Sequence, residues 1–326
     1  MGMKERKEVP LNSGGSNRDP THAALLEGAA IVERTGGGIL RLTGKDPVGM
    51  LNAILTNSVP PDAVPGAYAL LLNSKGRVQS DLRVLRSGTD VLVDTEPEGA
   101  DAAREILGRY APFSRVKLED LSDAWSVLGL YGPGAGDLLD GLALAEHGTA
   151  EVEIGDEILL AAGVAAPVPG YDLLGLSEAV ARAADHLAAL GAVSAGPDAY
   201  EAARIKAGVP RFGADLTPEN FPGEAGVLDR AVDFGKGCYP GQETVARMRY
   251  RGHPNKTLYR LSCAGASPAS GTRILQGEKR VGTVTSVSPV PENGEFFALG
   301  YLSRNTDLDA PIAAAGSRVR VLGEIS

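Results

Sequence analysis

The sequence predicts an α+β fold, with a mixed body over residues 21–250 and a small barrel or sandwich over residues 251–326. Strand and helix patterns alternate along the body, but its strands are joined by short turns, which favours antiparallel pairing over a doubly wound parallel sheet. After Gly252 the pattern changes to short strands about 8–12 residues apart with turn residues between them, which is typical of small all-β domains.

The first elements follow from apolar periodicity and helix caps. Residues 39–42 alternate as a strand, and Asp46-Pro47 then begins a helix, because aspartate is a good N-cap and proline suits the first helical position. Residues 67–85 predict two strands joined by a turn at 73–76. Further body elements are expected as strands at 91–94, 125–130, 158–161 and 171–174, and as helices at 99–110, 137–142, 177–190 and 198–207.

Two stretches lack this periodicity. Residues 209–239 are rich in Gly, Pro and Asp, and a loop of this length is uncommon unless it is functional or a linker. Residues 1–20 are polar and contain Pro10 and Pro20, so we expect a disordered lead-in there. Strands of the last domain are expected at 256–263, 273–275, 281–287, 296–302 and 318–322.

Composition excludes several classes of protein. The chain has 326 residues, of which 43% are hydrophobic, so a core of ordinary size is possible. It carries 32 basic and 41 acidic residues, a net charge of −9, which argues against DNA binding because duplex binders need a basic surface. No apolar run reaches the roughly 20 residues that span a bilayer, so no membrane partner is expected.

The cysteines indicate a reducing compartment. Two thiols, Cys238 and Cys263, are too few for a disulfide framework or for the four thiolates of an ordinary cluster. The four histidines are scattered without metal-ligand spacing, so no metal site is assigned. With its polar start, which is no secretory signal, the chain is expected to be cytoplasmic.

The segment D-F-G-K-G-C-Y-P-G-Q-E, residues 233–243, carries the strongest chemical signal and is called the cysteine loop below. Cys238 precedes an expected helix that begins at Gln242, and Lys236 is two residues away. Both features stabilise a thiolate, the form that attacks electrophiles or binds metal. From the residues alone, an inert loop cysteine is the alternative. Cys263 lies in a strand pattern and is expected to be a core residue.

The block K-G-C-Y-P-G-Q-E resembles the signature of the YgfZ/GcvT family of folate-binding proteins. Further blocks resemble it at 42–46, 55–57, 72–84 and 204–222, and these are shared with aminomethyltransferases of the glycine cleavage system. The resemblance implies a ring-like body, a C-terminal β-barrel and tetrahydrofolate or a derivative held near the centre. It also implies support of iron–sulfur client or assembly proteins, including enzymes that modify tRNA, with Cys238 and Lys236 as the reactive residues.

The same resemblance suggests which residues bind the folate. Asp81 would accept N–H donors of the pterin, as a carboxylate can. Tyr239 would either stack on a planar ligand or pack the loop. The remaining folate contacts are expected from Asn57, Arg204, Gln242, Glu243 and Arg247.

Two residues depart from the transferase pattern. Ser80 stands where the transferases have a second acid before the aspartate, and Lys206 stands where they often have glutamate. We therefore expect a folate-dependent accessory factor more than a classical aminomethyltransferase.

Two other functions stay open at this point. One is an aminomethyltransferase-like enzyme that uses Asp81 and tetrahydrofolate. The other is a non-catalytic adaptor whose basic run binds a protein or, weakly, tRNA; the same run is an alternative site for the glutamate tail of folate. That run consists of Arg247, Arg249, Arg251 and Lys256.

Overall fold

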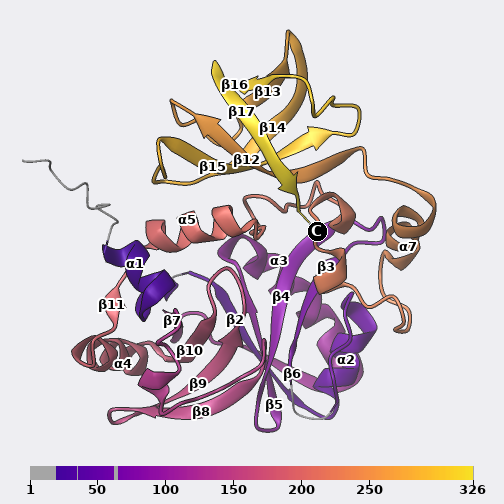
Figure 1. The fold of residues 1–326 in the computed structure, drawn as a ribbon. Coiled ribbons are helices and arrows are strands. Elements are labelled where there is room, and N and C mark those ends of the chain that lie inside the picture. The colour runs from indigo at the N-terminus through magenta and orange to yellow at the C-terminus, as the bar shows by residue number, and fades with distance from the viewer. Residues whose placement is uncertain (1–19, 35, 62–64, 326) are drawn as a thin grey trace, which may run out of the picture.

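Two sheets stand side by side below a β-barrel, with helices packed on their outer faces (Figure 1). The computed structural model describes residues 20–34, 36–61 and 65–325. The predicted α+β class with a C-terminal barrel is confirmed. The lead-in expected at 1–20 lies outside the described residues except for Pro20, where helix α1 (Pro20–Glu27) begins.

The five-stranded sheet forms the half of the body that carries Asp81. Its strand order is β3 (Ala67–Leu72), β4 (Val78–Ser87), β5 (Asp90–Thr95), β2 (Gly38–Gly44) and β6 (Val116–Asp120). Helices α2 (Pro47–Ile54) and α3 (Pro97–Tyr110), the latter extended by the 3₁₀ turn η1 (Ala111–Ser114), cover the face turned away from the other sheet through buried aliphatic side chains. The predicted cap is present, because the Gly49 amide donates to Asp46 Oδ1 at 2.8 Å.

The six-stranded sheet forms the other half. Its order is β11 (Val193–Ser194), β1 (Ala30–Arg34), β7 (Trp125–Tyr131), β10 (Gly170–Leu176), β9 (Glu157–Val164) and β8 (Thr149–Ile154). Helix α4 (Ser177–Ala189) packs against it through Val180 and Leu187. The pairing of β1 with β11 is parallel, and the other ladders of this sheet are antiparallel. The helix expected at 137–142 is only a 3₁₀ turn, η2 (Asp137–Leu139).

Helix α5 (Pro197–Ala207) runs between the sheets and the barrel and ends at Gly208, whose φ of +78° favours glycine. The segment that follows contains the short elements η3 (Pro222–Glu224) and α6 (Leu228–Ala231), and then α7 (Gln242–Arg251). The expected domain boundary between residues 250 and 251 lies in the last turn of α7.

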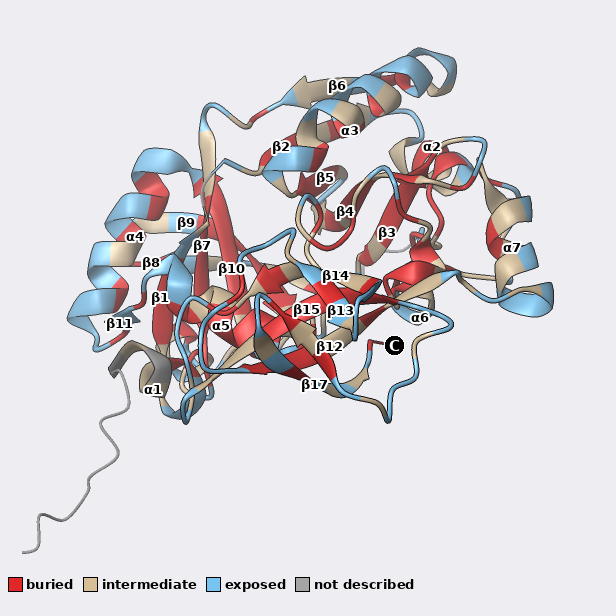
Figure 2. Cartoon of the chain, turned by 90° about the horizontal axis from the view of Figure 1, so that it is seen from above, coloured by how far each residue is buried: buried red, intermediate tan, exposed pale blue. Residues whose placement is uncertain are grey.

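The barrel closes through six strands. They are β12 (Lys256–Ala264), β15 (Glu295–Ser303), β14 (Lys279–Val287), β13 (Arg273–Gln276), β16 (Ile312–Ala314) and β17 (Ser317–Glu324), in that spatial order. Its core includes Cys263, which is buried as expected. Seen from above, the barrel strands lie between the two sheets (Figure 2).

Asp215 fixes the barrel to the body. Its fully buried carboxylate accepts from Arg204 Nη1 of α5 at 2.7 Å, and from Thr285 Oγ1 and Ser286 Oγ of β14 at 2.5 and 2.7 Å. Tyr301 of β15 adds a hydrogen bond to the Asp215 carbonyl at 2.7 Å. Since these partners come from the helix and from two barrel strands, one side chain sets how the barrel sits above the sheets.

None of the helices that the structure describes has the length and apolar character needed to cross a membrane.

Candidate functional site

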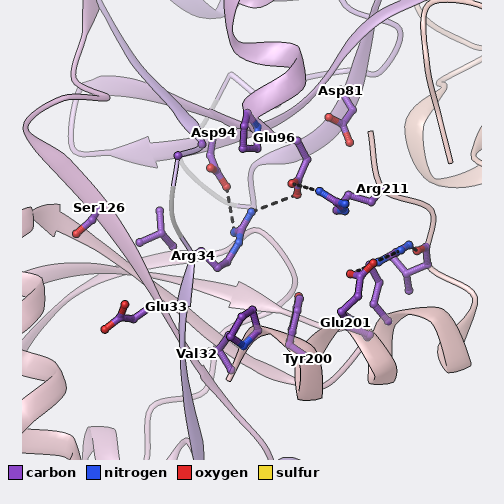
Figure 3. Close-up of a pocket in the computed structure, with 18 of the residues that line it drawn as sticks. Val32, Glu33, Arg34, Asp81, Asp94, Glu96, Ser126, Tyr200, Glu201 and Arg211 are labelled. Atoms are coloured by element: carbon purple, nitrogen blue, oxygen red, sulfur yellow. Dashed lines mark hydrogen bonds and ion pairs between the residues drawn. The ribbon is translucent and has the colours of Figure 1, made fainter. Parts of the chain in front are cut away.

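A cavity of about 570 Å³ lies where the two sheets face α5. Its walls come from β1, β4, β5, β7 and α5 and from the segment after α5 (Figure 3). Apolar walls are provided by Val32, Ile39, Trp125 and Val127. Its ionisable lining residues are Glu33, Arg34, Asp81, Asp94, Glu96, Asp198, Tyr200, Glu201, Arg204 and Arg211.

Asp81 is the carboxylate with an unmet hydrogen-bonding need. It is 8% exposed, and its Oδ2 accepts from the Tyr68 hydroxyl at 3.0 Å. Its Oδ1 has no hydrogen-bond partner among the described residues. Burial, reinforced by the negative charge of Glu96, raises the pKa of Asp81 to about 7. The side chain is therefore an acceptor suited to a ligand with N–H or O–H donors.

Strand alternation explains why Asp81 lines the cavity and Ser80 does not. Successive side chains of β4 point to opposite faces of the sheet. Ser80 is fully buried on the other face, where its Oγ lies 3.0 Å from Thr95 Oγ1. The position at which the transferases carry a second acid is therefore turned away from the cavity in this chain.

A buried charge network closes the cavity between the sheets. Arg34 of β1 donates to Asp172 of β10 at 2.8 Å, and Arg83 of β4 pairs with Asp94 of β5 at 2.5 Å and with Asp172 at 2.6 Å. Although burial acts in the opposite direction, Arg83 and Arg34 lower the pKa of Asp172. The network joins the two sheets, and its two arginines and two aspartates balance one another in charge.

Glu96 lies beside this network at the start of α3. Its carboxylate is 3.5 Å from Arg34 Nη2 and 3.9 Å from Arg211 Nη1, separations that are long for hydrogen bonds (Figure 3). Burial raises the pKa of Glu96 despite these two cations. Its negative charge is thus only partly compensated.

The cavity contains two of the residues predicted from the sequence, Asp81 and Arg204. The Arg204 guanidinium is already paired within the protein, because it donates to Glu201 at 2.7 and 2.8 Å and also to Asp215. Seven predicted residues are not part of the cavity lining: Cys238, Lys236, Asn57, Tyr239, Gln242, Glu243 and Arg247.

The cysteine loop forms a separate feature, fastened to the segment after α2. Lys236 Nζ donates to the Leu55 and Asn57 carbonyls at 2.6 and 3.0 Å, and burial lowers the pKa of Lys236 to about 8. Cys238 is exposed and unpaired. Tyr239 is 7% exposed and packs in the cluster of Leu72 and Val245, so its position is that of a packing residue.

Tyr68 connects the cysteine loop to the cavity. Its hydroxyl binds Asp81, and its carbonyl accepts from Asn57 Nδ2 at 2.9 Å. Asn57 in turn offers its own carbonyl to Lys236. The loop thus lies next to the wall that holds Asp81, although Cys238 itself is on the surface.

The basic run is less available than its sequence indicates. Arg249 pairs with Asp229 at 3.0 Å and covers the Phe234 ring, and Lys256 lies 4.5 Å above the Tyr301 ring. No cluster of three or more His, Cys, Asp or Glu side chains suited to a metal ion occurs in the described parts of the chain.

Gly241 brings the backbone of the cysteine loop into close contact with the β3–β4 turn. Its φ is +81°, and a Cβ built there would lie 2.6 Å from the Asn73 carbonyl oxygen. We expect Gly241→Ala to lower the free energy of unfolding by about 1–3 kcal/mol, from the left-handed conformation together with the clash. Urea denaturation measures this, with Gly237→Ala as the control because its Cβ would meet nothing within 4 Å. Equal losses in the two variants would contradict the tight contact.

Comparisons with known proteins agree with this architecture. Residues 17–156 match the GCVT N-terminal domain family. An aminomethyltransferase of Saccharopolyspora erythraea is 28% identical, with 91% of this chain and 84% of that protein covered. The tRNA-modifying protein YgfZ of Yersinia enterocolitica is 29% identical, with 87% of each covered.

The fold is shared with a solved transferase. The glycine cleavage system aminomethyltransferase T from Bartonella henselae superposes with a TM-score of 0.80 at 19% identity, over 93% of this chain and 87% of that one. The two sheets and the closed C-terminal barrel define a GcvT-type fold. Residues 17–156 thus match the GCVT N-terminal domain family, and the chain as a whole is similar to YgfZ and to aminomethyltransferases over most of its length.

Proposed function

We propose that this protein binds tetrahydrofolate or a derivative in the cavity between its sheets, and that it supports the assembly or repair of iron–sulfur enzymes in the cytoplasm through Cys238. The observation that carries the first part is Asp81, a buried cavity carboxylate with one oxygen lacking a partner. An unmet buried acceptor costs about 1–3 kcal/mol or more, so a ligand that supplies donors is bound favourably.

The cavity suits a pterin in chemistry and in size. The pterin ring presents a ring N–H and an exocyclic amino group side by side, and a carboxylate accepts both. The 570 Å³ volume lies within the range of roughly 300–1,000 Å³ typical of small-molecule sites. Tyr68 would hold the second carboxylate oxygen in place, and Trp125 and Ile39 provide apolar wall for the rings.

The exposed position of Cys238 supports a different task for it from that of the cavity residues. Because it is exposed and does not line the cavity, its reaction partner is expected to approach from the surface, as a client or assembly protein would. A single thiol supplies one ligand to an iron–sulfur cluster and needs others from the partner.

The role of the cysteine is tested by complementation. In a strain that lacks the gene, we expect wild-type protein and Cys263→Ala to restore the activity of iron–sulfur enzymes, including those acting on tRNA. Cys238→Ala is expected to restore less than about a tenth, as for loss of an essential nucleophile or ligand. Cys263 is the matched control because it is a buried barrel thiol. Full rescue by Cys238→Ala would remove the cysteine from the function.

One observation favours a second function, an aminomethyltransferase-like reaction. Asp81 has a pKa of about 7, which suits a general acid or base at neutral pH. Several relatives are named aminomethyltransferase. Incubation with an aminomethyl-loaded lipoyl carrier and tetrahydrofolate decides between the two: we expect no methylenetetrahydrofolate above the rate without protein, and its formation would establish the transferase.

A further inference from the structure

The cavity lining is rich in acid. Six carboxyl groups face three guanidinium groups, an excess of three acidic side chains. The carboxylates belong to Glu33, Asp81, Asp94, Glu96, Asp198 and Glu201, and the guanidinium groups to Arg34, Arg204 and Arg211. Such an excess is unexpected for a ligand whose glutamate tail is itself an anion.

Two of the three arginines are already neutralised by carboxylates of the protein. Arg34 is held by Asp172 at 2.8 Å and lies 3.5 Å from Asp94. Arg204 is held between Asp215 and Glu201, each at 2.7 Å. Within the described parts of the chain, these contacts leave Arg211 as the lining cation without a close ion pair, since it approaches Glu98 only to 3.7 Å and Glu96 only to 3.9 Å.

The negative charge that remains within the cavity comes from two carboxylates on one wall. Among the residues that the structure describes, Asp81 has an oxygen with no partner, and Glu96 has only long contacts to Arg34 and Arg211. Glu33 and Asp198 are exposed, so solvent screens them. Figure 3 shows Asp81 and Glu96 on the same side of the cavity, with Arg211 beside them.

Two carboxylates and the Arg211 guanidinium leave a net charge of at most −1 on this wall, which one positive charge on the ligand would balance. Among the one-carbon forms of reduced folate, the methenyl form carries a delocalised cation, because the carbon that bridges N5 and N10 makes them an amidinium. Tetrahydrofolate and its 5-formyl derivative are neutral there. The anionic tail is common to all three, so its interactions cancel when their affinities are compared.

We propose that the cavity selects the cationic methenyl class of reduced folate over neutral forms, and that Glu96 is the residue that determines this specificity. The inference rests on the proposed folate site and adds to it the charge of the preferred one-carbon unit. Burial raises the pKa of Asp81 to about 7 and also raises that of Glu96, as expected for carboxylates that lack full compensation.

The test is a comparison of three ligands at neutral pH. Methenyl-, 5-formyl- and unsubstituted tetrahydrofolate are mixed with the full-length protein in a stopped-flow instrument, and binding is followed by ligand or Trp125 fluorescence before the amidinium hydrolyses. We expect the methenyl form to bind at least about tenfold more tightly than the 5-formyl form, as one partly screened charge pair would give.

Two variants that each remove one negative charge distinguish a specific effect of Glu96 from a general change in the electrostatic potential of the cavity. Glu96→Gln is expected to reduce the preference to less than about threefold while its affinity for 5-formyltetrahydrofolate stays within about twofold of wild type, which also shows that the cavity is intact. Glu98→Gln removes a charge near Arg211 but outside the cavity lining, and is expected to keep the full preference.

The outcomes distinguish failure of cation selection from failure of folate binding. Equal affinity for the three ligands, or a preference unchanged in Glu96→Gln, overturns the selection of a cation while leaving folate binding in place. Failure of all three ligands to bind overturns the proposed folate site, and the selection with it.

Discussion

Replacement of Asp81 by asparagine is expected to weaken binding of tetrahydrofolate by about 100-fold or more. The amide cannot accept both donors of a pterin edge, and each hydrogen bond to a charged group contributes about 1.5–3 kcal/mol. Isothermal titration calorimetry measures the effect. Asp94→Asn is not a suitable control because Asp94 belongs to the buried network, whereas Asp198→Asn changes an exposed lining carboxylate and is expected to cost less than about threefold. Equal losses in both variants would contradict a specific role for Asp81.

The same substitution is expected to stabilise the ligand-free protein at higher pH. The pKa of Asp81 is raised from 3.8 to about 7 in the folded state, so the folded protein binds more protons than the unfolded chain between these values. Wild-type protein therefore loses stability as pH rises from about 4 to about 7, and Asp81→Asn does not. Direct conversion of the shift gives about 4 kcal/mol, and side-chain relaxation should reduce this to roughly 2 kcal/mol.

Urea unfolding at several pH values measures this difference. It should be near zero at the acidic end and constant above neutrality. An asparagine variant that is less stable than wild type at pH 8 would show that Asp81 is well compensated in the free protein, and would contradict the interpretation of Asp81 Oδ1 as an unmet acceptor.

The second large effect is expected at Asp215. Asp215→Ala leaves Arg204 buried with one fewer carboxylate and leaves Thr285 and Ser286 without their acceptor. Removal of one partner from a buried ion pair typically costs about 3–5 kcal/mol. We expect a loss of that size in the free energy of unfolding, together with weaker ligand binding, because α5 forms one wall of the cavity.

An exposed ion pair across the same two units provides the control. Lys206 of α5 pairs with Glu292 of the barrel at 2.5 Å, and the two side chains are 41% and 44% exposed. Glu292→Gln is expected to cost less than about 1 kcal/mol in urea denaturation. If Asp215→Ala costs no more than this, the barrel is held by other contacts and Asp215 is not the residue that fixes it.

Much of the fold could be predicted from local patterns, and the exceptions have physical reasons. The Asp46 cap, the hairpin turn at 73–76 and the stop at Gly208 depend on neighbouring residues, and each is present. Four body strands went unpredicted: β1, β6, β8 and β11. They are short or partly exposed, and β16 in the barrel has only three residues. Such segments become strands because partners exist in space, which periodicity does not report.

The site was harder to predict than the fold. Asp81 was found because its sequence block resembles a known family. Glu96 and the Arg34–Asp172 pair were missed, because 138 residues separate Arg34 from Asp172 and nothing local marks them. One signal was present: Asp81 and Arg83 are two residues apart and alternate with the apolar Leu82 and Val84, so they share a face of the strand and need partners there.

The cysteine loop shows the limit most clearly. Its sequence indicated an exposed thiol before a helix, and Cys238 is indeed exposed and precedes α7. Its spacing held no information about where the loop docks. The structure attaches Lys236 to the Leu55 and Asn57 carbonyls, and the cavity lining does not include Cys238.

A crystal structure of the protein soaked with tetrahydrofolate tests the central claim most directly. We expect the pterin between the two sheets and α5, with its ring N–H and amino group within hydrogen-bond distance of Asp81, and the tail leaving toward solvent. A ligand bound elsewhere, for instance against the cysteine loop, or a pterin in the cavity that makes no contact with Asp81, would contradict it.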